Sequence, residues 1–190
     1  EAEDHMRRII LATLALIMAA PARAQQADPA AIAAQKAAAG TFAWMDGTWR
    51  GVATTRGPSG EHKVTHTERI GTMLGGSLRV IEGRSFNLDG SIGFNAFAVI
   101  SYDPAKNAYN FRSYALGHAG DFIITPTADG YVWEVPAGPV TIRYTATLKD
   151  KVWTEIGERI VPGQPAACFF EMHLARVGDS AWPDGGAMTP

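Results

Sequence analysis

The sequence predicts an all-β protein: an antiparallel up-and-down β-barrel of about ten strands with a short N-terminal helix. From Thr48 onward, short stretches rich in β-branched and aromatic residues alternate with turns rich in Gly, Pro and Asp. A Gly-x-Trp motif, ending in Trp49, opens the first stretch, and Arg176 lies on the last. A tryptophan ring fills the narrow end of a barrel, and we expect the planar Arg176 guanidinium to cover its face. We predict that Trp49 and Arg176 have a structural role, and we do not place them in a ligand or active site.

Composition and charge narrow the class of protein. The chain has 190 residues, of which 46% are hydrophobic, and its 20 Gly and 11 Pro indicate one globular, turn-rich domain. A formal net charge of −2 gives no attraction to nucleic acid or to anionic membrane, so we expect no nucleic-acid partner. Cys168 has no second cysteine to pair with, and its apolar neighbours favour a buried, inert thiol.

The N-terminus has the three parts of a secretory signal peptide. Met6-Arg7-Arg8 precedes an apolar run over residues 9–20, and Ala22-Arg23-Ala24 supplies a cleavage site. We interpret residues 1–24 as a signal peptide, within which residues 1–5 precede the natural start. The run is shorter than the roughly 20 residues that span a bilayer, so we expect no transmembrane anchor in the mature chain. The predicted location is periplasmic or secreted.

A helical lead-in is predicted over residues 25–41. Asp28 has the residue type of an N-cap, Pro29 suits the first turn, and Gly40 follows an alanine-rich run as a stop signal. Residues 42–45 then anchor the chain to the barrel, which we place over residues 42–177. The Gly- and Pro-rich residues 178–190 are predicted to form a flexible tail.

The ten strands are placed by the turn signals between them. Gly57-Pro58-Ser59-Gly60, Asp89-Gly90 and Lys149-Asp150 are examples of these signals. Tight turns between short strands indicate antiparallel neighbours, and closure removes exposed strand edges. The predicted strands lie near residues 48–55, 61–70, 77–86, 92–102, 108–116, 120–126, 131–135, 140–148, 151–160 and 167–177.

Alternation along each strand sorts side chains into two faces. The apolar residues Val64 and Ile70 share a face with His66 and Glu68, so these polar groups are predicted to point inward. Tyr144 is placed inside by the same rule. On two strands, the residues predicted to face the interior are Ile142, Tyr144, Ala146 and Leu148, then Val152, Thr154, Ile156 and Glu158. Such an apolar interior with a few polar groups is typical of a small-molecule site.

Several motifs occur in an order that resembles a known superfamily. They are Trp44-Met45-Asp46-Gly47-Thr48-Trp49-Arg50-Gly51, Met73-Leu74-Gly75-Gly76, Tyr102-Asp103-Pro104 with Tyr109, and Glu171-Met172-His173-Leu174-Ala175-Arg176. Over about residues 42–177 the chain resembles the calycin superfamily, which includes lipocalins, fatty-acid-binding proteins and nitrobindin-like haem barrels. It looks most like secreted bacterial lipocalin-like domains of uncharacterised function. The resemblance implies a barrel that closes on itself.

The leading functional hypothesis is binding of a small, largely apolar ligand inside the barrel. His66, Glu68 and Tyr144 would orient it, Phe111 would stack on it, and His118 would stand at the barrel mouth in a Gly-rich turn. A filled barrel whose outer face meets a partner is a further alternative. The oligomeric state is not predicted.

A second hypothesis is a hydrolase or isomerase that needs no cofactor. His66 and Glu68 would exchange a proton with substrate, with Glu82, Tyr144 or Glu158 across the cavity. No catalytic residue is assigned, because the sequence has neither a Gly-x-Ser-x-Gly elbow nor a phosphate-binding loop.

A metal site is not expected, and a haem-binding barrel is the less favoured alternative. His62 and His66 are four residues apart on a predicted strand, roughly 13 Å, which is too far for one metal ion. Nitrobindin-like barrels carry their haem-binding His near the C-terminal end, where this chain has His173. Strand alternation sends His173 outward, and the Gly-rich Tyr-Pro segment of those barrels is missing after Trp49. We therefore expect no cofactor, with haem binding at His173 kept only as the less favoured alternative.

Overall fold

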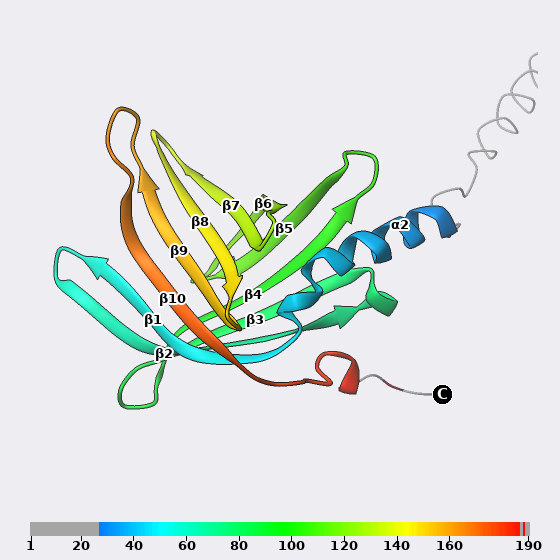
Figure 1. Cartoon of the computed structure of the whole chain (residues 1–190), viewed down its shortest axis with the longest axis horizontal. Coiled ribbons are helices and arrows are strands. Elements are labelled where there is room, and N and C mark those ends of the chain that lie inside the picture. Colours follow the sequence, from blue (N-terminus) through cyan, green and yellow to red (C-terminus); the bar gives the residue numbers. More distant parts are fainter. Residues whose placement is uncertain (1–26, 187, 189–190) are drawn as a thin grey trace, which may run out of the picture.

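The computed structural model describes residues 27–186 and 188, and within them it is a closed antiparallel barrel of ten strands (Figure 1). Each strand pairs with the next along the chain, and β1 pairs with β10 to close the ring. The predicted fold class is therefore confirmed. The strands are β1 Gly47–Gly57, β2 Gly60–Met73, β3 Leu78–Phe86, β4 Ile92–Asp103, β5 Ala108–Ala115, β6 His118–Pro126, β7 Gly130–Ala137, β8 Val140–Lys149, β9 Val152–Ile160 and β10 Ala167–Gly178.

The predicted helix is α2, Pro29–Ala39. Asp28 caps it, because its side chain accepts a hydrogen bond from the Ala31 amide at 3.0 Å. A 3₁₀ segment, η2 Gly40–Met45, then brings the chain to β1. Within the part of the chain that the structure describes, neither this nor any other helix is long and apolar enough to cross a bilayer. The predicted signal peptide lies outside the described residues.

One end of the barrel is closed by a packed apolar core. Phe42 and Met45 of η2 are fully buried there. Trp49 packs edge-on against Trp153, with ring centroids 5.6 Å apart, and its indole N–H donates to the Met45 carbonyl at 2.8 Å. These contacts satisfy the indole nitrogen and fill the space between converging strands. The segment that follows α2 therefore acts as the plug of the barrel.

Arg79, which the sequence analysis did not single out, fastens this plug. It lies on β3, is 2% exposed, and donates to the two carboxylate oxygens of Asp46 at 2.7 and 2.9 Å. It also donates to the Ala39 carbonyl at the end of α2. A planar guanidinium suits this two-pronged contact. Arg79 therefore ties α2, η2 and the barrel wall together.

Arg176 faces Trp49 across the closing seam, but it does not cover the indole ring. The two residues are partners in the β1–β10 ladder. The guanidinium of Arg176 donates to the Asp46 carbonyl at 3.2 and 3.3 Å and pairs with Asp179. Charge-assisted hydrogen bonds to a carbonyl and a carboxylate stabilise the Arg176 guanidinium more than a cation–π contact with the indole ring would. Among the described residues, guanidinium–ring contacts join Arg69 to Trp182 and Arg112 to Tyr114.

The inward face predicted for β9 is wrong. Val152 and Ile156 are each 37% exposed, whereas Trp153 is buried and Glu155 points into the barrel. The reason is the two-residue turn Asp150-Lys151, where both residues have positive φ. This turn sets Leu148 opposite Trp153, and cross-strand partners share a face. Glu158 consequently lies on the outer face.

The buried thiol predicted for Cys168 is also wrong, since Cys168 is exposed. The pairing of β10 with β9 shifts register between Cys168 and Phe170. Such an irregularity breaks the simple alternation of faces along the strand. Met172 and Leu174 are buried, and strict alternation would place Cys168 on their face. The register shift breaks this alternation before Cys168 is reached.

The seam between β6 and β7 is short. Only Ile124, Thr125 and Pro126 of β6 have partners on β7, namely Trp133, Val132 and Tyr131. Toward the opposite end of the barrel, residues 118–122 of β6 and 134–137 of β7 are not paired with one another within the described chain. The barrel wall therefore separates along this seam as it approaches the end away from the plug.

Candidate functional site

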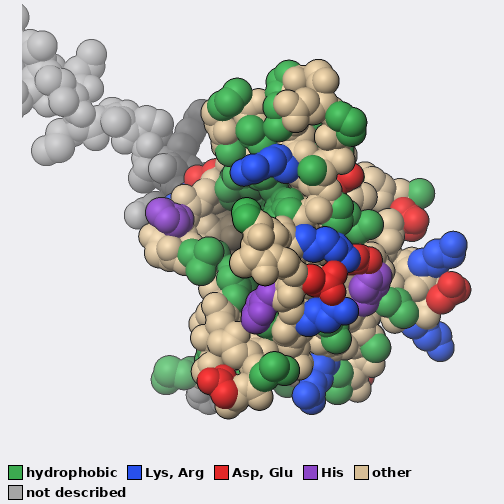
Figure 2. All heavy atoms as spheres, turned by 90° about the vertical axis from the view of Figure 1, so that its left-hand side faces the viewer, with side chains coloured by type: hydrophobic (Ala, Val, Ile, Leu, Met, Phe, Trp, Pro, Cys, Tyr) green, Lys and Arg blue, Asp and Glu red, His purple; other side chains and the backbone are tan. Residues whose placement is uncertain are grey.

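A cavity of about 650 Å³ occupies the half of the barrel away from the plug. It lies beneath the β1–β2, β3–β4, β5–β6, β7–β8 and β9–β10 hairpins, since residues near their turns, such as Thr55, Asn87 and Leu116, line it. Figure 2 looks onto this side of the molecule and shows a hollow whose visible walls are largely hydrophobic. A closed wall of ten strands is thus filled with side chains at one end and hollow at the other.

Aromatic rings form much of the cavity wall. Trp133 and Tyr144 are stacked, with ring centroids 4.5 Å apart and an angle of 12° between their planes. Phe111 packs against Trp133 at 4.9 Å. Gly157 leaves the room that Tyr144 needs, because a Cβ at that position would lie 3.0 Å from the Tyr144 ring. The wall therefore offers flat, apolar surfaces to a molecule inside.

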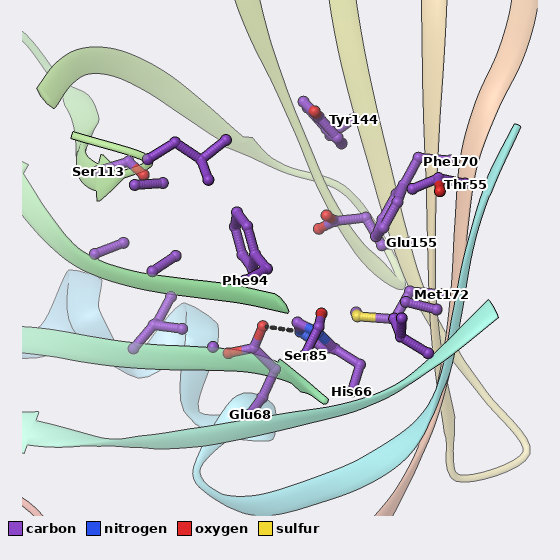
Figure 3. A pocket seen from close by; sticks show the side chains of 18 of the residues that line it. Thr55, His66, Glu68, Ser85, Phe94, Ser113, Tyr144, Glu155, Phe170 and Met172 are labelled. Atoms are coloured by element: carbon purple, nitrogen blue, oxygen red, sulfur yellow. Dashed lines mark hydrogen bonds and ion pairs between the residues drawn. The ribbon is translucent and has the colours of Figure 1, made fainter. Parts of the chain in front are cut away.

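A buried polar cluster lies on β2 and β3 at the side of this cavity (Figure 3). His66 is 4% exposed; its Nδ1 is 2.7 Å from the Ser85 hydroxyl and its Nε2 is 2.9 Å from Glu68 Oε1. Residues two apart on a strand share a face, and Ser85 is the ladder partner of His66. Strand geometry alone therefore brings the three groups together. The carboxylate can accept only from an Nε2–H, which fixes that nitrogen as a donor.

Glycine on the neighbouring strand makes room for the Glu68 carboxylate. A Cβ at Gly83 would lie 2.7 Å from Glu68 Oε1 and 3.1 Å from Oε2. Within the described chain, Oε2 is buried and has no hydrogen-bond partner. A buried carboxylate oxygen without a donor is costly, so this atom marks a place where a bound group would be stabilised.

Glu155 on β9 reaches into the cavity from another side (Figure 3). The hydroxyl of Tyr131 donates to its Oε2 at 2.5 Å. Burial raises the pKa of Glu155 to about 7, and the negative charge of Glu68 adds to this rise, while the Tyr131 hydrogen bond and His66 oppose it. At neutral pH this carboxyl is therefore present in both protonated and ionised forms.

Two tyrosines beside Glu155 stay protonated. Burial, followed by the charge of Glu155, raises the pKa of Tyr131 well above its ordinary value. The same two causes raise the pKa of Tyr144 to about 12. Both hydroxyls are consequently hydrogen-bond donors throughout the physiological pH range.

The structure brings four of the five predicted ligand-binding residues to one cavity. His66, Glu68, Phe111 and Tyr144 line it, whereas His118 is exposed at the start of β6 and is not among the lining residues. Whether any of them binds a ligand stays a prediction. Two acids suggested across the cavity are elsewhere: Glu82 pairs with Arg69 and Arg84, and Glu158 lies on the outer face of β9.

Ser85, Tyr131 and Glu155 were missed by the sequence analysis. Ser85 could have been found from its register with His66, once the turn between β2 and β3 was fixed. Glu155 could have been found from the Asp150-Lys151 turn, which determines the face of β9. Tyr131 has no comparable local signal, because its contact with Glu155 joins β7 to β9 across β8.

The haem ligand considered at His173 does not fit the structure. His173 is exposed on β10, where its Nε2 is 2.8 Å from Glu171 Oε1 and its Nδ1 is 3.1 Å from the Thr154 hydroxyl. It does not line the cavity. Within residues 27–186 and 188, no group of three or more His, Cys, Asp or Glu side chains could hold a metal ion.

No protein-family model matches the chain, and a search of curated proteins finds no significant similarity. The function has to be argued from the cavity itself.

Proposed function

We propose that this barrel binds a small, largely apolar molecule in its cavity. The observation that carries the proposal is a cavity of about 650 Å³ with aromatic walls and one convergent polar cluster. Small-molecule sites in proteins have this make-up: a concave, mostly apolar pocket with a few polar groups that fix orientation. The walls would supply affinity through apolar burial, and the groups around His66 and Glu155 would select the orientation.

The resemblance to calycins supports this proposal, because that superfamily is built around an interior site. We also propose that the protein is exported to the periplasm or the outside of the cell. This part of the proposal rests on the charged, apolar and small-residue segments of residues 1–24. No cofactor enters the proposal.

A neutral apolar dye tests the proposal directly. N-phenyl-1-naphthylamine fluoresces more strongly in an apolar environment, and we expect the protein to take it up with saturable binding. Ser113 lines the cavity on β5, so Ser113→Trp should fill part of it and weaken binding about tenfold or more. Arg112→Trp is the matched control, because Arg112 is exposed on the same strand.

Either of two results would count against a ligand cavity. Wild-type protein that takes up no dye would favour a barrel that acts as a solid scaffold. Equal weakening by Ser113→Trp and Arg112→Trp would place the dye on the outer surface instead.

A hydrolase or isomerase without a cofactor is the second candidate, and Glu155 favours it. A carboxyl with a pKa of about 7 can both give and take a proton near neutral pH. His66 and Glu68 lie on the same cavity wall, so a substrate would meet several groups able to move protons. In a screen of esters and ketones, any turnover should be lost in Glu155→Gln and kept in Glu158→Gln. Turnover that survives Glu155→Gln would remove Glu155 as the acid or base.

A further inference from the structure

We propose that the cavity selects a molecule with a positively charged nitrogen on an aromatic or otherwise apolar body. This inference rests on the function proposed above and names the chemical class of its ligand. It follows from which charges line the cavity, which oxygen atoms remain free, and what surrounds them.

The cavity carries acidic groups without compensating cations. Glu68 and Glu155 line it, and none of its lining residues in the described chain is Lys or Arg. His62 and His66 are the lining groups able to carry positive charge, and His66 is already engaged by Ser85 and Glu68. An anionic head group would be buried beside like charge with no cation to pair with, which is unfavourable. A cationic head group would be attracted.

Each of the two carboxyl groups has one oxygen engaged and one free. Glu68 Oε1 lies 2.9 Å from His66 Nε2, while its Oε2 is buried and has no partner in the described chain. Glu155 Oε2 accepts from the Tyr131 hydroxyl, and among the described residues no hydrogen bond is found at its Oε1. Among the described residues, two acceptor oxygens are therefore free, and neither Lys nor Arg lines the cavity beside them. An ammonium group, which has only donors, complements this arrangement.

The groups that face Glu155 come from three strands. Glu68 and His66 lie on β2, Tyr131 lies on β7, and Tyr144 lies on β8. Both tyrosines are neutral. The His66 ring lowers the pKa of Glu155 through its charge, but its hydrogen bonds go to Ser85 and Glu68, so among the described side chains none is an ion-pair partner of Glu155. A cation supplied by the ligand would fill that role.

The aromatic walls favour the same charge. The faces of aromatic rings carry partial negative charge and attract cations but not anions. Tyr131, Trp133, Tyr144 and Trp153 all line the cavity, as do Phe94 and Phe170, which are labelled in Figure 3. A flat aromatic amine could therefore stack on the walls while its nitrogen reaches the carboxyl groups.

Three probes with one naphthalene body separate the head-group classes: 2-(1-naphthyl)ethylamine, 2-(1-naphthyl)ethanol and 1-naphthaleneacetate. Affinities are measured by isothermal titration calorimetry at about pH 8, where Glu155 is mostly ionised. One charge-assisted hydrogen bond corresponds to about tenfold or more in affinity, so we expect the amine to bind at least that much more tightly than the alcohol. The acetate should bind most weakly.

Variants assign the effect to the cavity carboxyls. Glu155→Gln should weaken amine binding about tenfold and change alcohol binding by less than about threefold. Glu158→Gln, on the outer face of the same strand, should change neither. Lowering the pH to about 5 should weaken amine binding and leave alcohol binding unchanged, because Glu155 becomes protonated. Glu68→Gln provides a second test if Glu155→Gln does not fold, as judged by circular dichroism.

The outcomes distinguish this inference from the proposed function. Equal affinity for the three probes, or tightest binding of the acetate, would overturn the preference for a cation and leave a ligand cavity in place. Loss of the amine preference in Glu158→Gln as well would also overturn it. Failure of all three probes and of N-phenyl-1-naphthylamine would overturn the proposed function with it.

Discussion

Glu155 points into the barrel, although the inward face predicted for its strand would have sent it outward. It lies on the inner face of β9, accepts from Tyr131, and shares the cavity with Glu68. Burial disfavours its charged form, which makes it both a potential binding group and a source of instability. The cost of burying this charge can be measured as a change in the free energy of unfolding with pH.

The protonation of Glu155 should couple stability to pH. Its pKa is 4.5 in an ordinary setting and about 7 in the fold, so the folded protein binds this proton more tightly than the unfolded chain does. As pH rises from 4.5 through 7, the free energy of unfolding should fall, by roughly 3 kcal/mol in total. In Glu155→Gln this decline should be absent.

Urea denaturation at a series of pH values checks the prediction. Because other groups titrate alike in both proteins, the difference between wild type and Glu155→Gln isolates this carboxyl. Glu158→Gln serves as the control and should follow wild type. Parallel stability curves for wild type and Glu155→Gln would show that Glu155 titrates normally.

Arg79 should contribute far more to stability than a surface arginine. Arg79→Met removes the paired contacts to Asp46 and the donor to Ala39 from a buried position, and we expect a loss of roughly 3 kcal/mol. Arg143→Met is the control, since its pair with Glu134 is exposed and should be worth less than about 1 kcal/mol. Similar losses measured by chemical denaturation would contradict the role given to Arg79.

Among the elements, β6 and β7 form the weakest part of the wall. They share three paired positions, whereas β8 and β9 are paired continuously from Thr141 with Ile160 to Lys149 with Val152. Backbone groups that face an unpaired seam must find other partners, including water. The short seam is therefore where the barrel wall should open most readily.

Hydrogen exchange should reveal this seam. Amides in residues 118–122 of β6 and 134–137 of β7 that point toward the gap should exchange on the order of tenfold faster than those of the β8–β9 ladder. Mass spectrometry of peptides from these strands measures the difference. Equal protection of amides in all ten strands would contradict this prediction, because it would mean that the β6–β7 seam opens no more readily than the fully paired seams.

The molecule as a whole combines a packed end with a hollow end. Phe42, Met45, Trp49 and Trp153 fill one end, and the cavity occupies the other. The buried apolar core is concentrated at the packed end, and at the other end the side chains leave a cavity between them. A ligand bound there would replace missing packing contacts and stabilise the folded state.

Ligand should accordingly raise the melting temperature. At a free concentration about 100 times Kd, binding adds about 2.7 kcal/mol, which corresponds to roughly 5 to 10 °C for a chain of this size. Differential scanning calorimetry with N-phenyl-1-naphthylamine measures the shift, and Ser113→Trp should show little. A dye that fluoresces without moving the melting temperature would be bound outside the folded cavity.

Local signals explain why the fold was predicted well. Turn residues bound each strand, and Asp28, Pro29 and Gly40 bound the helix, so all ten strands and α2 occur close to the predicted positions. His66 and Glu68 were placed inside correctly, because Val64 and Ile70 settle the face of β2. On β9 both faces carry large apolar residues, and composition could not choose between Trp153 and its exposed neighbours.

The sequence by itself determined the barrel, its strands, the capped helix and the inward face of β2, because turns and alternation are properties of neighbouring residues. Only the tertiary structure decided that Glu155 joins Tyr131 across an intervening strand, that Arg79 fastens the plug, and that Cys168 is exposed. These depend on ladder register, on bulges and on how strands far apart in the chain face one another. A one-residue change in register reverses the face of every side chain on a strand. Register depends on how two strands pair, so it cannot be read from the sequence of one strand alone.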